Sequence, residues 1–138
     1  MAVNSGLLRF STPGGCEIVD LTEGVASIVS RSEVRHGVAV VFGDGSTVAV
    51  TTMEFEPGAV ADLRAALERL LPAGLDYEHN RLNHDTNAHA HLRAAMIGPS
   101  ETVPVVDGRL ALGTWQQIVL LDLDVRPRER TVHVSVLS

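Results

Sequence analysis

Four of the chain's six histidines lie within a stretch of 13 residues, at His79, His84, His89 and His91. Imidazole gains or loses a proton near neutral pH more readily than other side chains, and it is the commonest metal ligand in proteins. A polar segment that holds so many histidines is therefore the first place to expect acid–base or metal chemistry.

The spacing of His89 and His91 limits how both could bind one metal ion. Residues two positions apart share one side of a strand but lie about 200° apart around a helix. If Asn87 begins a helix, the two imidazoles diverge, and His79 joins from the preceding loop. A zinc or magnesium site made by His79, His89 and His91, or by a subset of them, is one interpretation. Histidines hydrogen-bonded within the protein, or an acid–base pair without metal, are the others.

Two further segments carry polar side chains that could serve a histidine site. Glu54 follows a pair of threonines where a strand runs into a helix, and it is the better acidic partner for a histidine or a metal. Glu56 is expected to be only a helix N-terminal charge. Gln116 stands beside Trp115, the only tryptophan. This pair either has a structural role or forms the wall of a pocket with Gln116 as amide donor.

Arg126, Arg128 and Arg130 alternate near the C-terminus. On an extended backbone all three would project to one side. Three guanidinium groups together suit a phosphate or a carboxylate. The alternative is a solvated turn in which an arginine pairs with Glu129.

Composition favours one aliphatic domain over residues 1–138. Hydrophobic residues make up 45% of the chain but aromatic residues only 4%. The formal charge of −6 argues against nonspecific binding to nucleic acid or to an anionic membrane. Cys16 is the only cysteine, and we expect it to lie in the core. The sequence shows no signal peptide and no apolar run long enough to span a membrane. We therefore expect a cytoplasmic protein.

The elements that would position these side chains alternate between strands and helices. Hydrophobic patterning and turn residues predict strands over 7–10, 37–42, 47–53, 102–106, 109–112, 117–124 and 131–137, and helices over 22–32, 57–71 and 87–97. The turns at 43–46 and 107–108 indicate hairpins. Residues 72–86 are expected to be a long polar loop, which is typical of a functional segment. We therefore expect an α+β fold with an antiparallel sheet and helices on one face.

Several short motifs follow one another from about residue 16 to the C-terminus. They are Gly45-Ser46-Thr47, Thr51-Thr52-Met53-Glu54-Phe55-Glu56-Pro57-Gly58, Asp62, Pro72, Tyr77-x-His79, Asn87-x-His89-x-His91-Leu92-Arg93-Ala94, Gly98-Pro99-Ser100, Val103-Pro104-Val105, Gly108-Arg109-Leu110-x-Leu112-Gly113-Thr114-Trp115-Gln116 and Arg128-x-Arg130. In this order they resemble the YjbQ family of secondary thiamine-phosphate synthase enzymes.

The resemblance implies a homotrimer whose sheets pack around a threefold axis, with polar pockets near the subunit boundaries. It also implies a reaction that joins hydroxymethylpyrimidine diphosphate to thiazole phosphate and releases pyrophosphate. Such a reaction needs charge neutralisation, by Mg²⁺ or arginine, and a group that manages a proton. The residues expected in these roles are His79, His91 and Glu54 for catalysis, and Arg93, Arg128, Arg130, Asn87 and Gln116 for a small phosphorylated partner.

The chain departs from the family's commonest form at Val50, where many members carry a histidine before the threonine pair. We expect His89, which is typical of this branch, to compensate. The alternative function is a metal- or anion-binding protein without turnover.

Overall fold

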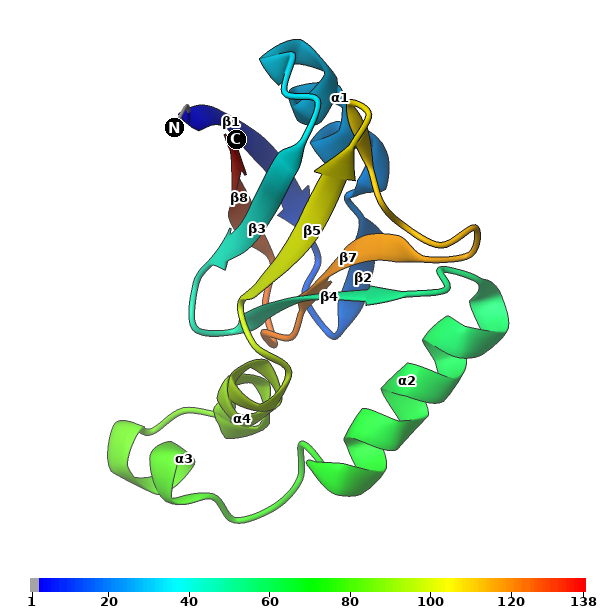
Figure 1. The fold of residues 1–138 in the computed structure, drawn as a ribbon. Helices are drawn as coiled ribbons and strands as arrows, with labels where there is room; N and C mark the ends of the chain where they lie inside the picture. The colour runs from blue at the N-terminus through cyan, green and yellow to red at the C-terminus, as the bar shows by residue number, and fades with distance from the viewer. Residues whose placement is uncertain (1–2) are drawn as a thin grey trace.

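The computed structural model describes residues 3–138 (Figure 1). Eight strands and four helices are described, in the order β1 (Val3–Thr12), β2 (Glu17–Asp20), α1 (Thr22–Ser32), β3 (Gly37–Asp44), β4 (Val48–Met53), α2 (Pro57–Leu70), α3 (Glu78–Asn83), α4 (Ala88–Ile97), β5 (Ser100–Val106), β6 (Arg109–Leu110), β7 (Gln117–Asp122) and β8 (Arg128–Leu137).

The strands form two sheets, and every neighbouring pair of strands is antiparallel. One sheet has the order β1-β8-β3-β5-β6, and the other has the order β2-β7-β4. The expected antiparallel α+β fold is thus confirmed, with its strands divided between two sheets.

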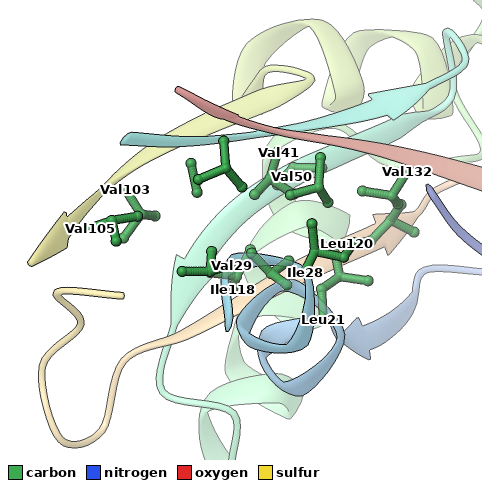
Figure 2. Packing of buried hydrophobic residues seen from close by; sticks show 14 of the residues in the cluster. Leu21, Ile28, Val29, Val41, Val50, Val103, Val105, Ile118, Leu120 and Val132 are labelled. Carbon is green, nitrogen blue, oxygen red and sulfur yellow. The ribbon is translucent and has the colours of Figure 1, made fainter. Parts of the chain in front are cut away.

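The larger hydrophobic core lies between the two sheets and is covered by α1. Figure 2 shows Val41 of the five-stranded sheet, Val50 and Leu120 of the three-stranded sheet, and Ile28 of α1 converging in it. All of these side chains are at most 4% exposed. Because the chain has few aromatic residues, closely packed β-branched and leucine side chains fill this core.

A smaller core lies on the other face of the three-stranded sheet, beneath α2 and α4 (Figure 1). Val119 and Leu121 of β7 pack there with Leu67 of α2 and Ala90 of α4. Because β7 is covered on both faces, it reads in the sequence as an unbroken apolar run. The expected helical cover on one sheet face is formed by α2 and α4.

One predicted hairpin is wrong and another is confirmed. The turn at 43–46 carries the chain from β3 in one sheet to β4 in the other, so these strands do not pair. Two successive runs of β-branched residues predict two strands. The hydrophobic pattern along each run, however, does not indicate which sheet the strand joins. The turn at 107–108 does close a hairpin, in which Val105 pairs with Leu110.

The histidine-rich segment is more regular than expected. The predicted loop at 72–86 contains the short helix α3, which is followed by α4 at Ala88. Glu56 caps α2 by accepting the backbone N–H groups of Gly58 and Ala59, as expected of a helix N-terminal charge. None of the helices within residues 3–138 is long and apolar enough to cross a membrane.

Candidate functional site

His79 of α3 and His91 of α4 lie against each other. Their ring centroids are 4.6 Å apart and the ring planes are inclined by 57°. The Nε2 atom of His79 lies 3.0 Å from the side-chain oxygen of Asn87, which is 5% exposed. Because that oxygen only accepts, His79 carries its proton on Nε2 and leaves Nδ1 as an acceptor, near the Asn83 amide nitrogen at 3.5 Å. The His79 ring is thus oriented by two asparagines.

His91 stands at the edge of a surface hollow of about 350 Å³. The hollow is lined by His91 with Gly45, Ser46, Val48, Ala94, Ala95 and Pro99. No protein group within residues 3–138 is hydrogen-bonded to the His91 ring. One imidazole of the pair is therefore fixed by the protein, and the other is available to a bound molecule.

A buried ionic cluster lies behind this hollow and connects the two sheets. Arg130 Nε and Nη2 each donate to Asp122 at 2.8 Å, and Arg130 Nη2 also donates to Thr47 Oγ1 at 2.8 Å. Thr47 donates to Asp124 at 3.1 Å, and Arg128 Nε donates to Asp124 at 3.0 Å. The guanidinium groups expected to bind phosphate are therefore matched by carboxylates of the same chain.

Hydrogen bonds keep both carboxylates ionised despite their burial. Burial alone would raise the pKa of Asp122, but the hydrogen bonds from Arg130 and Thr12 outweigh it and hold that pKa below its usual value. Burial also acts to raise the pKa of Asp124, and the N–H of Val125 and the Arg128 guanidinium lower it further than burial raises it.

His89 does not join the histidine pair. Its side chain is buried on the face of α4 that is packed against the protein, and its Nδ1 atom has no hydrogen-bond partner among residues 3–138. Burial lowers the pKa of His89, and the neighbouring Arg93 lowers it further. Arg93 is itself 5% exposed and donates to the Leu71 carbonyl at 2.8 Å and to Glu68 at 2.9 Å.

Within one chain, the structure does not bring His79, His89 and His91 together, and the metal site stays a prediction. Among residues 3–138, no three histidine, cysteine, aspartate or glutamate side chains gather closely enough to hold a metal ion. The reason is the helical spacing: α4 turns His89 inward and His91 toward the hollow.

Glu54 and Gln116 both lie at the end of β4 opposite to the hollow at His91. Gln116 Nε2 donates to Thr52 Oγ1 at 3.0 Å, at the end of β4 that leads into Glu54. The hollow at His91 touches Val48, at the other end of β4. Six residues of extended chain separate Val48 from Glu54, which is about 20 Å. The expected catalytic set is thus divided between two ends of one strand.

Comparison with known proteins places the chain in a family. The family model described as UPF0047 protein YjbQ-like matches residues 7–138. The chain belongs to the YjbQ family. It is 39% identical over 136 residues to a UPF0047 protein of Methanothermobacter thermautotrophicus, covering 99% of this chain and 93% of that protein. It is 42% identical over 130 residues to one of Archaeoglobus fulgidus, covering 94% and 98%.

Solved structures of YjbQ-like proteins have the same fold. A YbjQ-like protein of unknown function from Sulfolobus solfataricus superposes with a TM-score of 0.89 at 32% identity, covering 99% of both chains. A hypothetical protein from Aeropyrum pernix superposes with a TM-score of 0.85 at 36% identity, covering 96% of this chain and 98% of that one.

In this YjbQ-family chain, Val50 belongs to the core and not to the site. Its side chain is fully buried between the sheets, where it pairs with Leu120. Compensation for it by His89 stays a prediction. The structure places the Val50 side chain in the core between the sheets and buries the His89 side chain on α4 near Arg93.

Sequence reasoning missed Asp122, Asp124 and Thr47. The signal available was a pair of aspartates ending an otherwise apolar strand, because ionised carboxylates are rarely buried without a partner. The arginines two residues apart on β8 are those partners. Arg126, the third member of the predicted trio, instead reaches Asp85 in the segment between α3 and α4, at 3.8 Å.

Proposed function

We propose that this chain is a transferase of the thiamine-phosphate synthase type, whose site is built around His79 and His91. The observation that carries the proposal is the imidazole pair itself. Asn87 fixes one ring from within the protein, and the other ring faces a hollow that could admit a small molecule. A positioned imidazole with free ring nitrogens suits proton transfer at a reacting group.

In the proposed reaction, a nitrogen of thiazole phosphate attacks the methylene carbon of hydroxymethylpyrimidine diphosphate. The new carbon–nitrogen bond forms as the carbon–oxygen bond breaks, and pyrophosphate leaves with the electron pair. His91, supported by His79, donates a hydrogen bond or a proton to the leaving pyrophosphate. Stabilising charge that develops on a leaving group is the largest contribution that such a donor makes.

A single protomer offers few cationic side chains that could neutralise the charge of the substrate phosphates. Arg128 and Arg130 are matched by Asp124 and Asp122, and Arg93 is matched by Glu68. Because His79, His89 and His91 do not converge within residues 3–138 of one chain, we assign no step to a metal held by them. Arg126 is the least constrained arginine of the C-terminal trio, since its contact with Asp85 is 3.8 Å long and 56% of its side chain is exposed.

The proposal includes a homotrimer, because the expected residues do not meet within one chain. Glu54 and Gln116 could approach His91 only from a neighbouring copy. Exposed apolar side chains, among them Leu92, Met96 and Trp115, support burial against a partner.

The test is direct assay of untagged protein with both phosphorylated substrates and detection of thiamine phosphate. His91→Ala is expected to lower kcat by about 100-fold or more, the usual contribution of a general acid or base. His36→Ala is the matched control, because 67% of the His36 side chain is exposed and it lies outside the site. Binding of either substrate without product formation would reject the synthase reaction and favour the anion-binding alternative.

A further inference from the structure

A second hollow, of about 410 Å³, lies between α1 and β6, and we call it the α1–β6 hollow. It is at the opposite end of β5 from the hollow at His91, because Pro99 before β5 lines the one and Gly108 after β5 lines the other. The seven residues of β5 span about 23 Å as extended chain. Figure 1 shows the chain leaving β5 beside α1 and away from α4. A molecule in the α1–β6 hollow is therefore remote from the histidine pair.

One wall of the α1–β6 hollow is a single face of α1. Thr22, Ala26, Val29 and Ser30 line it, and this spacing places all four on one side of a helix. Between the first and the last of them the helix rises by about 12 Å. The Thr22 hydroxyl already accepts the backbone N–H of Ile118. The wall therefore offers an elongated surface, with the hydroxyl of Ser30 at one end.

The opposite wall is the segment of chain that follows the turn between β5 and β6. Its Leu110 and Leu112 are half-buried against the larger core, and Val29 on the facing helix is 1% exposed. Between the two leucines, the N–H of Ala111 donates to the Pro104 carbonyl at 2.9 Å. The middle of the hollow is therefore apolar, and its backbone is fixed by the sheet before any ligand arrives.

Arg109 is the one charged residue that lines this hollow in the described part of the chain. It forms no ion pair with any residue in the range 3–138. The acid nearest to it in sequence, Asp107, is paired with Arg35 at 3.4 Å and with His36 at 3.6 Å. The intervening Gly108 donates its N–H to the Arg35 carbonyl at 2.9 Å, which fixes the turn. A guanidinium left without an acid at the edge of an apolar hollow favours an anion that carries an apolar group.

The charges on the other side of Arg109 restrict that anion to a single negative charge. An adjoining hollow of about 320 Å³ shares Arg109 and Ser30 with the first, and it is also lined by Glu33 and Asp107. Arg35 offsets the charge of Asp107, but no cation among residues 3–138 is paired with Glu33. This carboxylate repels a second negative charge placed at Arg109. A carboxylate fits better than a phosphate dianion, because it carries one charge and its two oxygens match a guanidinium.

We propose that the α1–β6 hollow binds a medium-chain aliphatic carboxylate. The carboxylate lies between the Arg109 guanidinium and the Ser30 hydroxyl, and the aliphatic chain runs along α1 toward Leu112. Each methylene that enters the hollow leaves water for an apolar surface and adds to the affinity. The volume of the hollow is within the range of small-molecule sites. This site goes beyond the proposed transferase reaction and does not depend on it.

Calorimetric titration of the untagged wild type with sodium octanoate tests the site. Octanoate is expected to bind saturably, with one molecule to each chain. The neutral analogue 1-octanol is expected to bind at least about 10-fold more weakly, which is the usual loss when a charged hydrogen-bonding partner is missing. Octyl phosphate at about pH 8, where it is a dianion, is also expected to bind more weakly than octanoate.

Two variants separate the charge from the shape of the hollow. Arg109→Gln is expected to weaken octanoate binding by at least about 10-fold, and Arg31→Gln is the matched control, because Arg31 is exposed on α1 and does not line the hollow. Ala26→Phe fills the hollow from an exposed position and is expected to abolish binding. Ser27→Phe, at the next exposed position outside the hollow, is its control. All four variants are expected to fold, because each replaces an exposed residue.

Five results would overturn the proposal. They are a wild type without saturable octanoate binding, 1-octanol that binds as tightly as octanoate, octyl phosphate that binds more tightly, an Arg109→Gln variant with unchanged affinity, and a control variant that loses as much affinity as its counterpart. None of these results depends on formation of thiamine phosphate, so the transferase reaction is tested separately.

Discussion

Arg130 and Asp122 form a two-pronged ion pair, with two nitrogen–oxygen distances of 2.8 Å, inside the protein. The two side chains are 7% and 0% exposed. Because Arg130 belongs to β8 and Asp122 to β7, this pair joins the five-stranded sheet to the three-stranded sheet next to the histidine hollow. The stability of the fold and the shape of the candidate site are therefore coupled there.

Removing one partner of this pair should be strongly destabilising. Asp122→Ala leaves the Arg130 guanidinium buried without its carboxylate, and breaking a buried pair in this way costs about 3–5 kcal/mol of unfolding free energy. Urea unfolding measures the effect. The double variant Asp122→Leu/Arg130→Met should recover much of the loss, because neither charge is then buried. Equal destabilisation in the double variant would contradict this account.

The same carboxylates should make the protein acid-sensitive. The pKa values of Asp122 and Asp124 are lowered in the folded state relative to 3.8, the ordinary value of an aspartate side chain. Their stabilisation is therefore present above that value and is lost as pH falls through the lower folded pKa values. Thermal unfolding followed from pH 7 downward should show a steep loss of Tm on the acid side. In Asp124→Asn that part of the pH dependence should be reduced, and an unchanged profile would argue against Asp124 as a source.

His89 should give a separate pH dependence nearer neutrality. Its folded pKa is lowered from 6.5, so the unfolded chain takes up a proton at a pH where the folded chain does not. The contribution of His89 is thus present above about pH 6.5 and is lost as pH falls below it. His89→Leu also removes the buried Nδ1 atom, which has no hydrogen-bond partner in the part of the chain that the structure describes. The Tm of this variant relative to the wild type should rise as the pH is lowered from 8 to 5, and a constant difference across that range would exclude His89.

Gly45 should tolerate no side chain. A Cβ atom there would lie 3.0 Å from Arg130 Nη1, and the Gly45 φ angle of +142° is one that other residues rarely adopt. Gly45→Ala should therefore lower the unfolding free energy by more than about 1 kcal/mol, through strain and displacement of Arg130. Gly74→Ala is the control, because within the described residues no atom beyond its chain neighbours lies within 4 Å of its Cβ position. Comparable stability of the two variants would show that Arg130 moves freely.

The local elements of the fold could be predicted from the sequence, and the long-range pairings could not. Helical spacing and Pro57 place α2, and the Asp107-Gly108 turn predicts its hairpin, because these signals act within a few residues. The assignment of β3 and β4 to different sheets depends on contacts with β8 and β7, which lie far along the chain. No local pattern carries that information.

The candidate site likewise has features that local sequence predicts and features that depend on long-range contacts. The helical geometry of α4 predicts that His89 and His91 diverge, and they do. The pairing of Arg130 with Asp122 needs the register of β7 and β8, and the distance of Glu54 from His91 needs the length of β4. The histidine-rich segment could therefore be singled out, but its partners could not be assigned.

The order of the strands sets when this protein can complete its fold during synthesis. β7 is the central strand of the three-stranded sheet, and β8 lies between β1 and β3 in the other. Both come after residue 116, so β1, β2 and β4 emerge from the ribosome before the strand that each of them pairs with. Folding dominated by such distant pairings is slow and leaves strand edges exposed to aggregation. Until β7 and β8 have emerged, the edges of β1, β2 and β4 therefore stay unpaired.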